Sequence, residues 1–190
     1  MAIAEDRPQR ADARRNRAAI VKAARAVFAR YGREAQMDDV ARRAKVGVGT
    51  LYRHFPTKDA LLAALAEDRF RQLAGFAQDA LAVDDPWAAF EGFLHRAAVL
   101  QASDRALSQL LTEQPGLMRA AACERGDLLS ALRTLVERGT RAGVLRADAR
   151  WEDIPLTLCA LSRIGDGPPG ATWERLLKLL LDGFRAPAAG

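Results

Sequence analysis

The chain has 190 residues, of which 49% are hydrophobic and 28% charged, and a formal net charge of +5 at pH 7. This composition is that of a folded protein and is too apolar for a globally disordered chain. No apolar run approaches the roughly 20 residues of a membrane-spanning helix. The two cysteines, Cys123 and Cys159, are too few and too far apart for a disulfide framework or a zinc site. Residues 1–10 lack the apolar stretch of a signal peptide, so we expect a cytoplasmic protein without a membrane partner.

The spacing of apolar residues is helical along the chain, and signals for β-strands are nearly absent. The helices are expected at about 11–31, 37–44, 48–54, 58–81, from Pro86 past residue 98, and at 104–112, 116–141, 150–164 and 171–185. Gly32 closes the first helix, Pro56 stops the third, and Thr57 can cap the fourth. The sequence therefore predicts an all-α fold of about nine helices.

Positive charge is concentrated at the N-terminal end. Residues 1–58 carry a net charge of +8, whereas residues 59–190 carry −3. A basic third joined to a mildly acidic remainder is typical of a protein that meets a polyanion with one end. A chance run of solvated arginines would give the same balance, so the charge alone leaves both interpretations open.

Residues 37–55 have the design of a helix-turn-helix. Two helices of about two turns bury little surface by themselves, so their inward positions must be small or branched. The residues that meet this need are Val40, Ala41, Ala44, Val46, Leu51 and Phe55. Once these face the core, the second helix directs outward Val48, Gly49, Thr50, Tyr52, Arg53 and His54.

The outward set has the chemistry of a DNA-binding surface. Gly49 and Thr50 add little bulk near the start of the helix, so the backbone could approach base edges in the major groove. Tyr52 and His54 can hydrogen-bond phosphates, and Lys58 places a cation at the next helix N-terminus. Arg53 could contact either the DNA backbone or a base. A helical hairpin that merely packs is the alternative, and the surrounding basic charge favours DNA.

The same segment resembles a known family. The string DVARRAKVGVGTLYRHFPTK at 39–58, preceded by the run Ile20–Phe28 and by Tyr31-Gly32, is similar to the N-terminal domain of TetR/AcrR-type transcriptional regulators. The resemblance covers about the first 65 residues, and the rest is similar only in length, helix count and lack of strands. It implies a homodimer with one helix-turn-helix per subunit, bound to a double-stranded DNA operator, and repression relieved by a small-molecule effector. It also implies that Gly49 and Thr50 lie at bases and that Tyr52, His54 and Lys58 hold phosphates.

Two positions depart from the family pattern. Lys45 stands in the turn where the family commonly has Gly, and a left-handed backbone there would cost about 1 kcal/mol. Gly47 stands where a Ser commonly caps the second helix, and it is a weaker cap. Both bear on stability more than on DNA contacts. Residues 1–14, which include Arg7, Arg10 and Arg14, form either a basic arm that reaches a minor groove or a disordered tail.

The last two predicted helices, at 150–164 and 171–185, carry more apolar surface than a single core-facing stripe requires. Because helix-turn-helix modules read half-sites about 34–36 Å apart, we expect a two-fold dimer built from these helices. A buried core within one chain is the alternative. The expected interface residues are Trp151, Leu158, Leu161, Leu176, Leu180 and Phe184.

The larger part of the chain also supplies candidates for an effector pocket. They are Phe76, Trp87, Phe90, Phe93, His95, Met118 and Cys159. An aromatic residue at helical spacing equally suits plain core. His95, which follows Glu91 by one turn and lies near Phe93, could orient a ligand in an apolar cavity, and a satisfied or half-exposed histidine is its alternative.

The hypothesis that follows is a homodimeric DNA-binding repressor. Its N-terminal three-helix helix-turn-helix domain would occupy residues 1–58, and a larger helical bundle at 59–190 would bind ligand and dimerise. No Gly-rich phosphate loop, metal-ligand spacing or nucleophile elbow is present in the sequence. We therefore expect no catalytic residue, no metal and no cofactor. A helical adaptor or sequestering protein that no longer reads DNA is the alternative.

Overall fold

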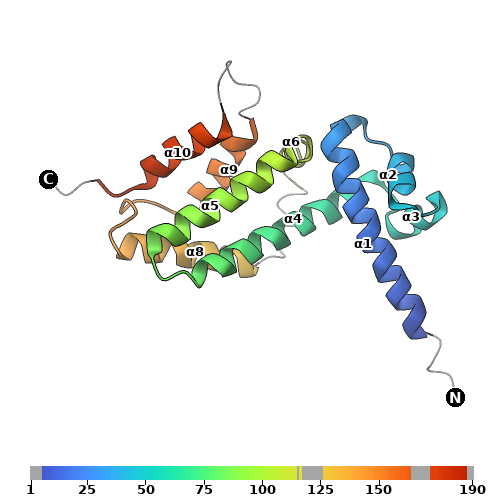
Figure 1. The fold of residues 1–190 in the computed structure, drawn as a ribbon, viewed down its shortest axis with the longest axis horizontal. Helices are drawn as coiled ribbons and strands as arrows, with labels where there is room; N and C mark the ends of the chain where they lie inside the picture. The colour runs from blue at the N-terminus through green and yellow to red at the C-terminus, as the bar shows by residue number, and fades with distance from the viewer. Residues whose placement is uncertain (1–5, 115, 117–125, 164–171, 188–190) are drawn as a thin grey trace.

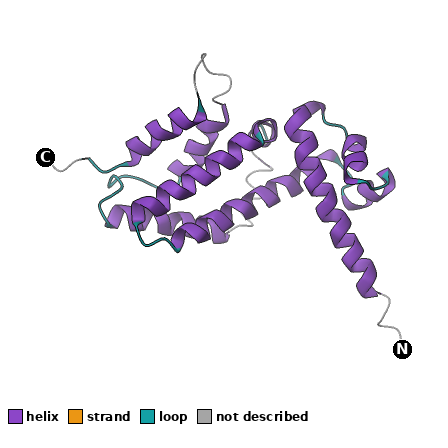
Figure 2. Cartoon of the chain, viewed as in Figure 1, coloured by secondary structure: helices purple, strands orange, loops and turns teal. Residues whose placement is uncertain are grey.

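A computed structural model describes residues 6–114, 116, 126–163 and 172–187. Within these ranges nine α-helices and one short 3-10 helix make up the fold, and Figure 2 shows helices and loops without a strand. A single antiparallel bridge between Leu145 and Arg185 is the one extended pairing in the same ranges. The predicted all-α fold is confirmed. Part of the helix expected at 116–141, including Met118, lies outside the described residues.

The N-terminal elements are α1 (Asp6–Tyr31), η1 (Gly32–Glu34), α2 (Met37–Ala44) and α3 (Val48–His54). The bounds of α2 and α3 coincide with those predicted. α1 begins at Asp6, ahead of the predicted start at residue 11, so the backbone of residues 6–14 is helical where an arm or a disordered tail was expected. Pro8 does not prevent this, because a proline in the first turn removes an N–H that has no helical partner anyway.

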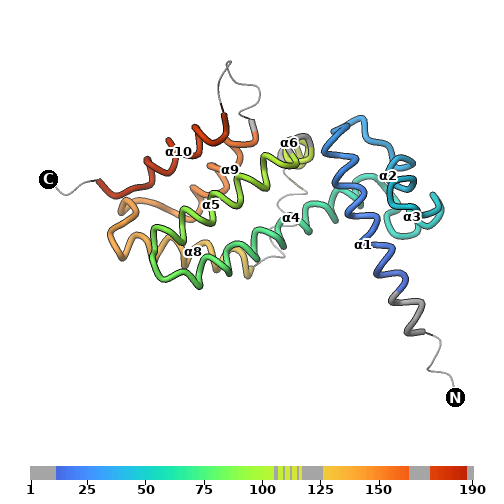
Figure 3. The backbone as a smooth tube through the Cα atoms, in the orientation of Figure 1, coloured from blue at the N-terminus to red at the C-terminus, as the bar shows by residue number. Residues whose placement is uncertain are grey.

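The long helix α4 (Lys58–Leu81) connects the two ends of the molecule. Its 24 residues span about 36 Å, and it runs from beside α1 into the larger group of helices (Figure 3). Thr57 caps it as predicted, since its Oγ1 accepts a hydrogen bond of 3.0 Å from the amide of Ala60. A rigid rod of this length is suited to carry a displacement from one end of the molecule to the other.

The remaining helices are α5 (Pro86–Ser103), α6 (Arg105–Thr112), α8 (Gly126–Arg141), α9 (Asp153–Arg163) and α10 (Trp173–Phe184). Of these, α5 and α8 pack against α4, α9 and α10 pack against α5, and α6 packs against α1 (Figure 1). Pro86 opens α5 behind Asp85, whose Oδ1 accepts a hydrogen bond of 2.6 Å from the amide of Ala88. In the part of the chain that the structure describes, no helix is both long and apolar enough to cross a bilayer.

Two hydrophobic cores hold these elements. The N-terminal core contains the inward residues of α1, α2 and α3, the first part of α4 through Ala66, and three leucines of α6. The C-terminal core contains the second part of α4 with α5, α8, α9 and α10. Phe70 on α4 packs against both. The packing of the helix-turn-helix therefore reaches beyond residue 58, because α6 returns from the larger group to cover α1.

Polar contacts reinforce this junction. Arg33 of η1 donates from Nε to Glu113, just after α6, at 3.0 Å. Arg69 of α4 is only 5% exposed, and its Nη2 donates to Ser108 Oγ at 2.9 Å and to Gln101. Burial lowers the pKa of Arg69 to about 10. Within the described residues Nη1 of Arg69 has no hydrogen-bond partner, so this guanidinium is incompletely compensated.

Candidate nucleic-acid interface

The helix-turn-helix is built on four residues with almost no exposure. Val40 and Ala41 of α2 are 0% and 1% exposed, and Leu51 and Phe55 are 0% and 3% exposed. Ala41 is small where α2 and α3 meet, and its carbonyl accepts the amide of Val46 at 3.1 Å as the chain turns. These positions match the predicted inward set, and they fix which face of α3 is left outside.

The turn between α2 and α3 contains the strain that the sequence suggested. Lys45 has φ 58° and ψ 38°, the left-handed conformation that a glycine adopts more readily. Its amide donates to the carbonyl of Arg42 at 3.2 Å, which closes α2. Gly47 caps α3 without a side-chain hydrogen bond. Both departures from the family pattern thus affect the backbone of the motif.

The outward face of α3 is open to solvent along its length. Tyr52 is 42% exposed and Val48 is 44% exposed, and Arg53 is exposed as well. Tyr52 and Arg53 make no hydrogen bond or ion pair with the described residues, so their polar groups are free for another molecule. A Cβ added at Gly49 would meet no atom within 4 Å, so the backbone of α3 is bare at that point. Such a face can approach base edges in a major groove.

The other predicted contacts are less exposed. Thr50 and His54 are half-buried, and the His54 ring lies 6.4 Å from that of Phe55. Lys58 is also half-buried, and its Nζ donates to the carbonyl of Arg33 at 2.6 Å and lies 5.5 Å from the centre of the Phe28 ring. An ammonium has three donors, so a phosphate at the start of α4 could still bind it. In this structure, however, Lys58 also anchors η1.

Cations outside the predicted set extend the basic surface. Arg43 and Lys45 are exposed beside α3 without an ion pair to the described residues, whereas Arg42 is paired with Asp39. Sequence reasoning did not place Arg43 and Lys45 in the site, although the charge of residues 1–58 included them. The helical periodicity of α2 was the signal that could have found Arg43, because it lies outside the inward stripe.

The residues predicted for an effector pocket are dispersed. Phe90 and Phe93 are 0% and 1% exposed in the C-terminal core, and Phe93 and the half-buried Phe76 line a shallow pocket of about 190 Å³. Arg96 lies over the Phe76 ring at 4.1 Å. The half-buried Trp87 donates from Nε1 to Glu91 at 2.9 Å. These aromatics do not converge on one cavity in the described part of the chain.

Two further predicted pocket residues lie at the surface of the single chain. His95 is exposed, with its ring 6.1 Å from that of Trp173, and Cys159 is exposed on α9. The expectation that His95 faces an apolar cavity is wrong here. Because successive helical residues turn by about 100°, α5 cannot bury both Phe93 and His95 against the same core.

The helices α9 and α10 leave an apolar groove between them. It has a volume of about 690 Å³, and Leu156 and Leu179, which line it, are 68% and 56% exposed. Of the residues predicted for a dimer interface, Leu180 lines the groove and Leu161 is buried inside the chain at 4% exposure. At one end, the Arg146 guanidinium binds Asp148 and lowers the pKa of that carboxyl.

Most other predicted interface residues are also occupied by the chain's own packing. Phe184 is 8% exposed and lies edge-on to Phe90 with ring centres 5.0 Å apart, although part of it reaches the groove. Trp151, Leu158 and Leu176 are half-buried against the C-terminal core. Sequence reasoning did not single out Leu156 and Leu179 as exposed. When a helix has two apolar faces, its sequence does not reveal which face packs inside the chain.

Comparisons with known proteins agree with this architecture. Residues 20–65 match the family described as bacterial regulatory proteins, tetR family, and residues 85–186 match the C-terminal domain of SbtR-like transcriptional regulators. A TetR transcription regulatory protein from Mycobacterium vanbaalenii is 37% identical, with a TM-score of 0.68 over 94% of this chain and 100% of that one. The TetR transcriptional regulator SCO0520 from Streptomyces coelicolor is 31% identical, with a TM-score of 0.63 over 90% and 99%.

A more distant likeness extends to the fold alone. The fatty acid degradation regulator FadR from Bacillus halodurans is 20% identical, with a TM-score of 0.64 over 88% of this chain and 98% of that one. No match is found among curated proteins. The similarity therefore covers both the helix-turn-helix and the larger group of helices.

Proposed function

The chain belongs to the TetR family of transcriptional regulators, and we propose that it acts in the cytoplasm as a homodimeric, non-enzymatic repressor released from its operator by a small molecule. The DNA-binding domain is assigned to residues 1–58, and the remaining helices to dimerisation and effector binding. The observation that carries the DNA-binding part is the outward face of α3, where Tyr52 is 42% exposed on a helix whose Leu51 is fully buried.

In the proposed complex, α3 enters a major groove. Gly49 and Thr50 lie at base edges, Tyr52 and His54 hold phosphates, and Arg53 contacts either. Lys58 adds a phosphate contact at the first turn of α4, where unpaired amides also favour an anion. This role for Lys58 requires its ammonium to keep the Arg33 carbonyl while it binds the phosphate with a second N–H.

The two tyrosines of the chain allow a matched test of this surface. Tyr52 is 42% exposed on α3 and Tyr31 is 46% exposed at the end of α1, away from the proposed bases. With DNA from the promoter beside the protein's own gene, fluorescence anisotropy should show that Tyr52→Ala weakens binding about tenfold, the loss of one good contact. Tyr31→Ala should bind as the wild type does. Equal affinities in all three proteins would refute the orientation of α3.

Salt provides an independent measure of the same contacts. Each phosphate neutralised by a cation releases counterions, so the logarithm of affinity should fall linearly as the logarithm of salt concentration rises. The slope should be shallower for Lys58→Gln than for the wild type, by about 1. An affinity that does not respond to salt would contradict the phosphate contacts, and absence of any promoter binding would favour the adaptor that no longer reads DNA.

Dimerisation is proposed to cover the groove between α9 and α10. The exposed Leu156 and Leu179 would pack against the same residues of a second copy, as the self-complementary contact of a two-fold dimer requires. Sedimentation should show that Leu179→Asp is monomeric. Val99→Asp introduces the same charge at an apolar position on α5 that is 44% exposed, and this variant should remain dimeric. A monomeric wild type at high concentration would overturn this part.

Release by an effector follows from the same arrangement. A small molecule between α4 and α5, at the pocket lined by Phe76 and Phe93, would displace α4 and change the spacing of the two α3 helices. Such a ligand can weaken operator binding only by its preference for one state, typically 1–3 kcal/mol. Phe76→Ala should retain operator binding and lose the response to any compound that releases the wild type.

A further inference from the structure

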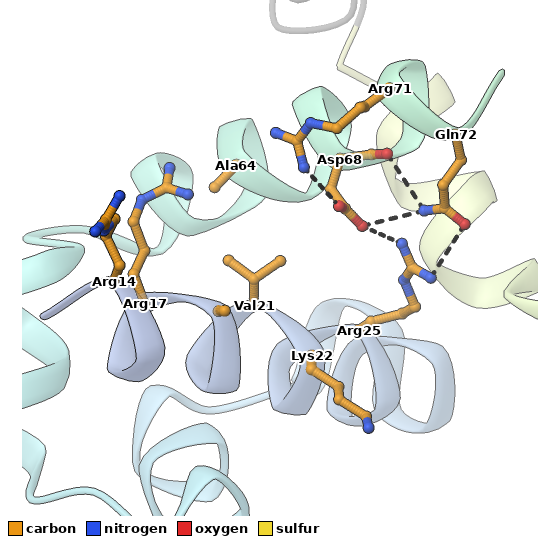
Figure 4. A pocket seen from close by; sticks show the side chains of 10 residues that line it. Arg14, Arg17, Val21, Lys22, Arg25, Ala64, Asp68, Arg71 and Gln72 are labelled. Carbon is orange, nitrogen blue, oxygen red and sulfur yellow. Dashed lines mark hydrogen bonds and ion pairs between the residues drawn. The ribbon is translucent and has the colours of Figure 1, made fainter. Parts of the chain in front are cut away.

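Another concave surface lies where α1 of the DNA-binding domain meets α4, away from the face of α3. It is a cleft of about 540 Å³ between α1 and α4, lined by Arg14, Arg17, Ala18, Val21, Lys22, Arg25, Ala64, Asp68, Arg71 and Gln72. Figure 4 shows α1 and α4 side by side with these side chains between and along them. Neither the proposed DNA contacts nor the proposed dimer groove uses this cleft.

The lining is strongly basic. Five of the ten lining residues are cations and one is a carboxylate. The six lining residues of α1, from Arg14 to Arg25, lie on one face of the helix over a length of about 16 Å. Arg14 and Arg17 lie together at one end, and Arg25 and Arg71 lie at the other, from opposite helices (Figure 4). Lys22 stands at the rim and is turned away from α4 in this view.

One end of the cleft is held in position by Asp68. Its Oδ2 binds Arg25 and accepts Gln72 Nε2 at 3.1 Å, and its Oδ1 accepts Arg71 Nη1 at 3.0 Å. Gln72 also accepts from Arg25 at 3.4 Å. Arg25 also pairs with Asp104, since its Nε lies 3.6 Å from Oδ2, so two carboxylates balance the two guanidiniums at this end. Each guanidinium has five N–H donors in a fixed plane, so both keep donors for a ligand. Their geometry is fixed before a ligand arrives, which lowers the cost of binding. The net positive charge of the lining comes from Arg14, Lys22 and the weakly paired Arg17.

The other end presents arginines with weaker partners. Arg17 lies 5.3 Å from the centre of the Phe55 ring, and its ion pair with Glu67 is long, at 3.8 Å. Arg14 is exposed and makes no ion pair with the described residues. Planar guanidiniums bind phosphate oxygens through paired hydrogen bonds. The cleft therefore offers phosphate-binding groups at both ends.

The volume of the cleft and its apolar floor indicate which kind of anion it can bind. A volume of 540 Å³ lies within the range of small-molecule sites, about 300–1,000 Å³, and a DNA duplex is too large to enter. Between the two arginine pairs the floor is apolar, formed by Ala18, Val21 and Ala64. We propose that this cleft binds a small molecule with two or three linked phosphates, and that the apolar floor accepts an attached organic group such as a base.

Calorimetric titration of the full-length protein tests the proposal, with inorganic tripolyphosphate and adenosine triphosphate as separate probes at near-physiological salt. We expect saturable binding with one site per chain. Arg14→Gln and Arg71→Gln, one at each end, should each weaken it about tenfold. Both residues are solvent-exposed, so circular dichroism should show unchanged folds. Arg141→Gln, an exposed arginine on α8, is the matched control and should bind as the wild type does.

Comparing the two probes distinguishes the contribution of the phosphates to binding from that of the apolar floor. Equal affinities would show that the phosphate chain alone is recognised, and tighter binding of the nucleotide would show that the floor accepts the base. The tighter binding supports the proposal, whereas equal affinities would overturn the role given to the floor. Absence of saturable binding of both probes would overturn it. So would a loss of binding in Arg53→Gln on α3 with none in Arg71→Gln, because the anion would then occupy the DNA-binding face.

A final measurement distinguishes a phosphate-binding role of the cleft from a role in operator binding. If Arg71→Gln lowered promoter affinity and its salt slope while neither phosphate probe bound, the cleft would belong to the operator contact and the proposal would fail. We expect instead that promoter affinity without added phosphate compound is unchanged by Arg71→Gln.

Discussion

The two cores of this protein leave different surfaces uncovered. The N-terminal core draws alanines, leucines, branched residues, Phe28 and Phe55 from α1 to α4 and from α6, and one polar face remains outside on α3. The C-terminal core contains Phe90, Phe93 and Phe184, and several tryptophans are only half-covered at its edge. Its last helices also leave Leu156 and Leu179 exposed. The surface proposed to bind DNA is thus local and polar, whereas the surface proposed to bind a second copy is apolar and combines residues from two separate helices.

The largest effect that distinguishes the two cores is expected at Gly139 on α8. A Cβ there would come within 2.5 Å of Leu145 Cδ1, and Leu145 is 1% exposed and has little room to move. Gly139→Ala should therefore lower the free energy of unfolding by about 2 kcal/mol, measured by urea denaturation. Gly75→Ala on α4 is the control: its added Cβ meets nothing, so stability should rise slightly. A stable Gly139→Ala would mean that the C-terminal core repacks easily.

The next largest effect is a loss of promoter affinity on changing the polar outward face of α3. Gly49→Ala adds a methyl group that meets no protein atom, so thermal unfolding should show an unchanged or slightly raised stability. The same methyl group would stand at the proposed base edges, and promoter affinity should fall about tenfold. A variant that kept full promoter affinity would show that α3 does not approach the bases at this residue.

The turn of the helix-turn-helix gives a smaller effect of opposite sign. Lys45 has a left-handed backbone, so Lys45→Gly should raise the free energy of unfolding by about 1 kcal/mol. Lys45→Ala removes the same charge without relieving the strain and should not stabilise. Chemical denaturation of both variants separates conformation from charge. Equal stabilities of the two variants would contradict the conformational explanation.

The smallest effect is expected at the junction of the cores. Burial lowers the pKa of Arg69 to about 10 in the folded protein, whereas the pKa of an arginine in the unfolded chain is higher. The unfolded state therefore binds more protons at alkaline pH, so this residue's contribution to stability rises as pH increases through 10. Relative to Arg69→Met, wild-type stability should gain a fraction of a kcal/mol between about pH 9 and pH 10.5. Arg71→Met, at an exposed position of the same helix, is the control for the loss of a guanidinium.

Prediction from the sequence succeeded where the signal was local. The bounds of α2 and α3 and the cap at Thr57 follow from short-range spacing and turn chemistry, and the structure has all of them. The left-handed backbone of Lys45 was raised only as a condition by the family pattern, and the structure meets that condition. The DNA-binding set could also be read from short-range spacing, because burying Leu51 on a short helix exposes Tyr52 next to it. Its contacts with DNA remain predictions.

Prediction was weaker where several segments meet. The sequence could not show that α6 leucines would join the N-terminal core, or that His95 would lie outside the C-terminal one. It also named Leu161 and Phe184 for an interface, and the chain buries both itself. A periodic pattern identifies an apolar face and does not identify what covers it.

The sequence by itself determined the helices, their caps, the small residues of the helix-turn-helix and the basic charge of its surroundings, because each depends on neighbours within a few positions. Only the tertiary structure decided that Lys58 bonds to the Arg33 carbonyl, that Asp68 holds Arg25 and Arg71 across the α1–α4 cleft, and that Leu156 and Leu179 remain uncovered. These contacts join residues far apart in the chain, and their geometry exists only once the helices have packed.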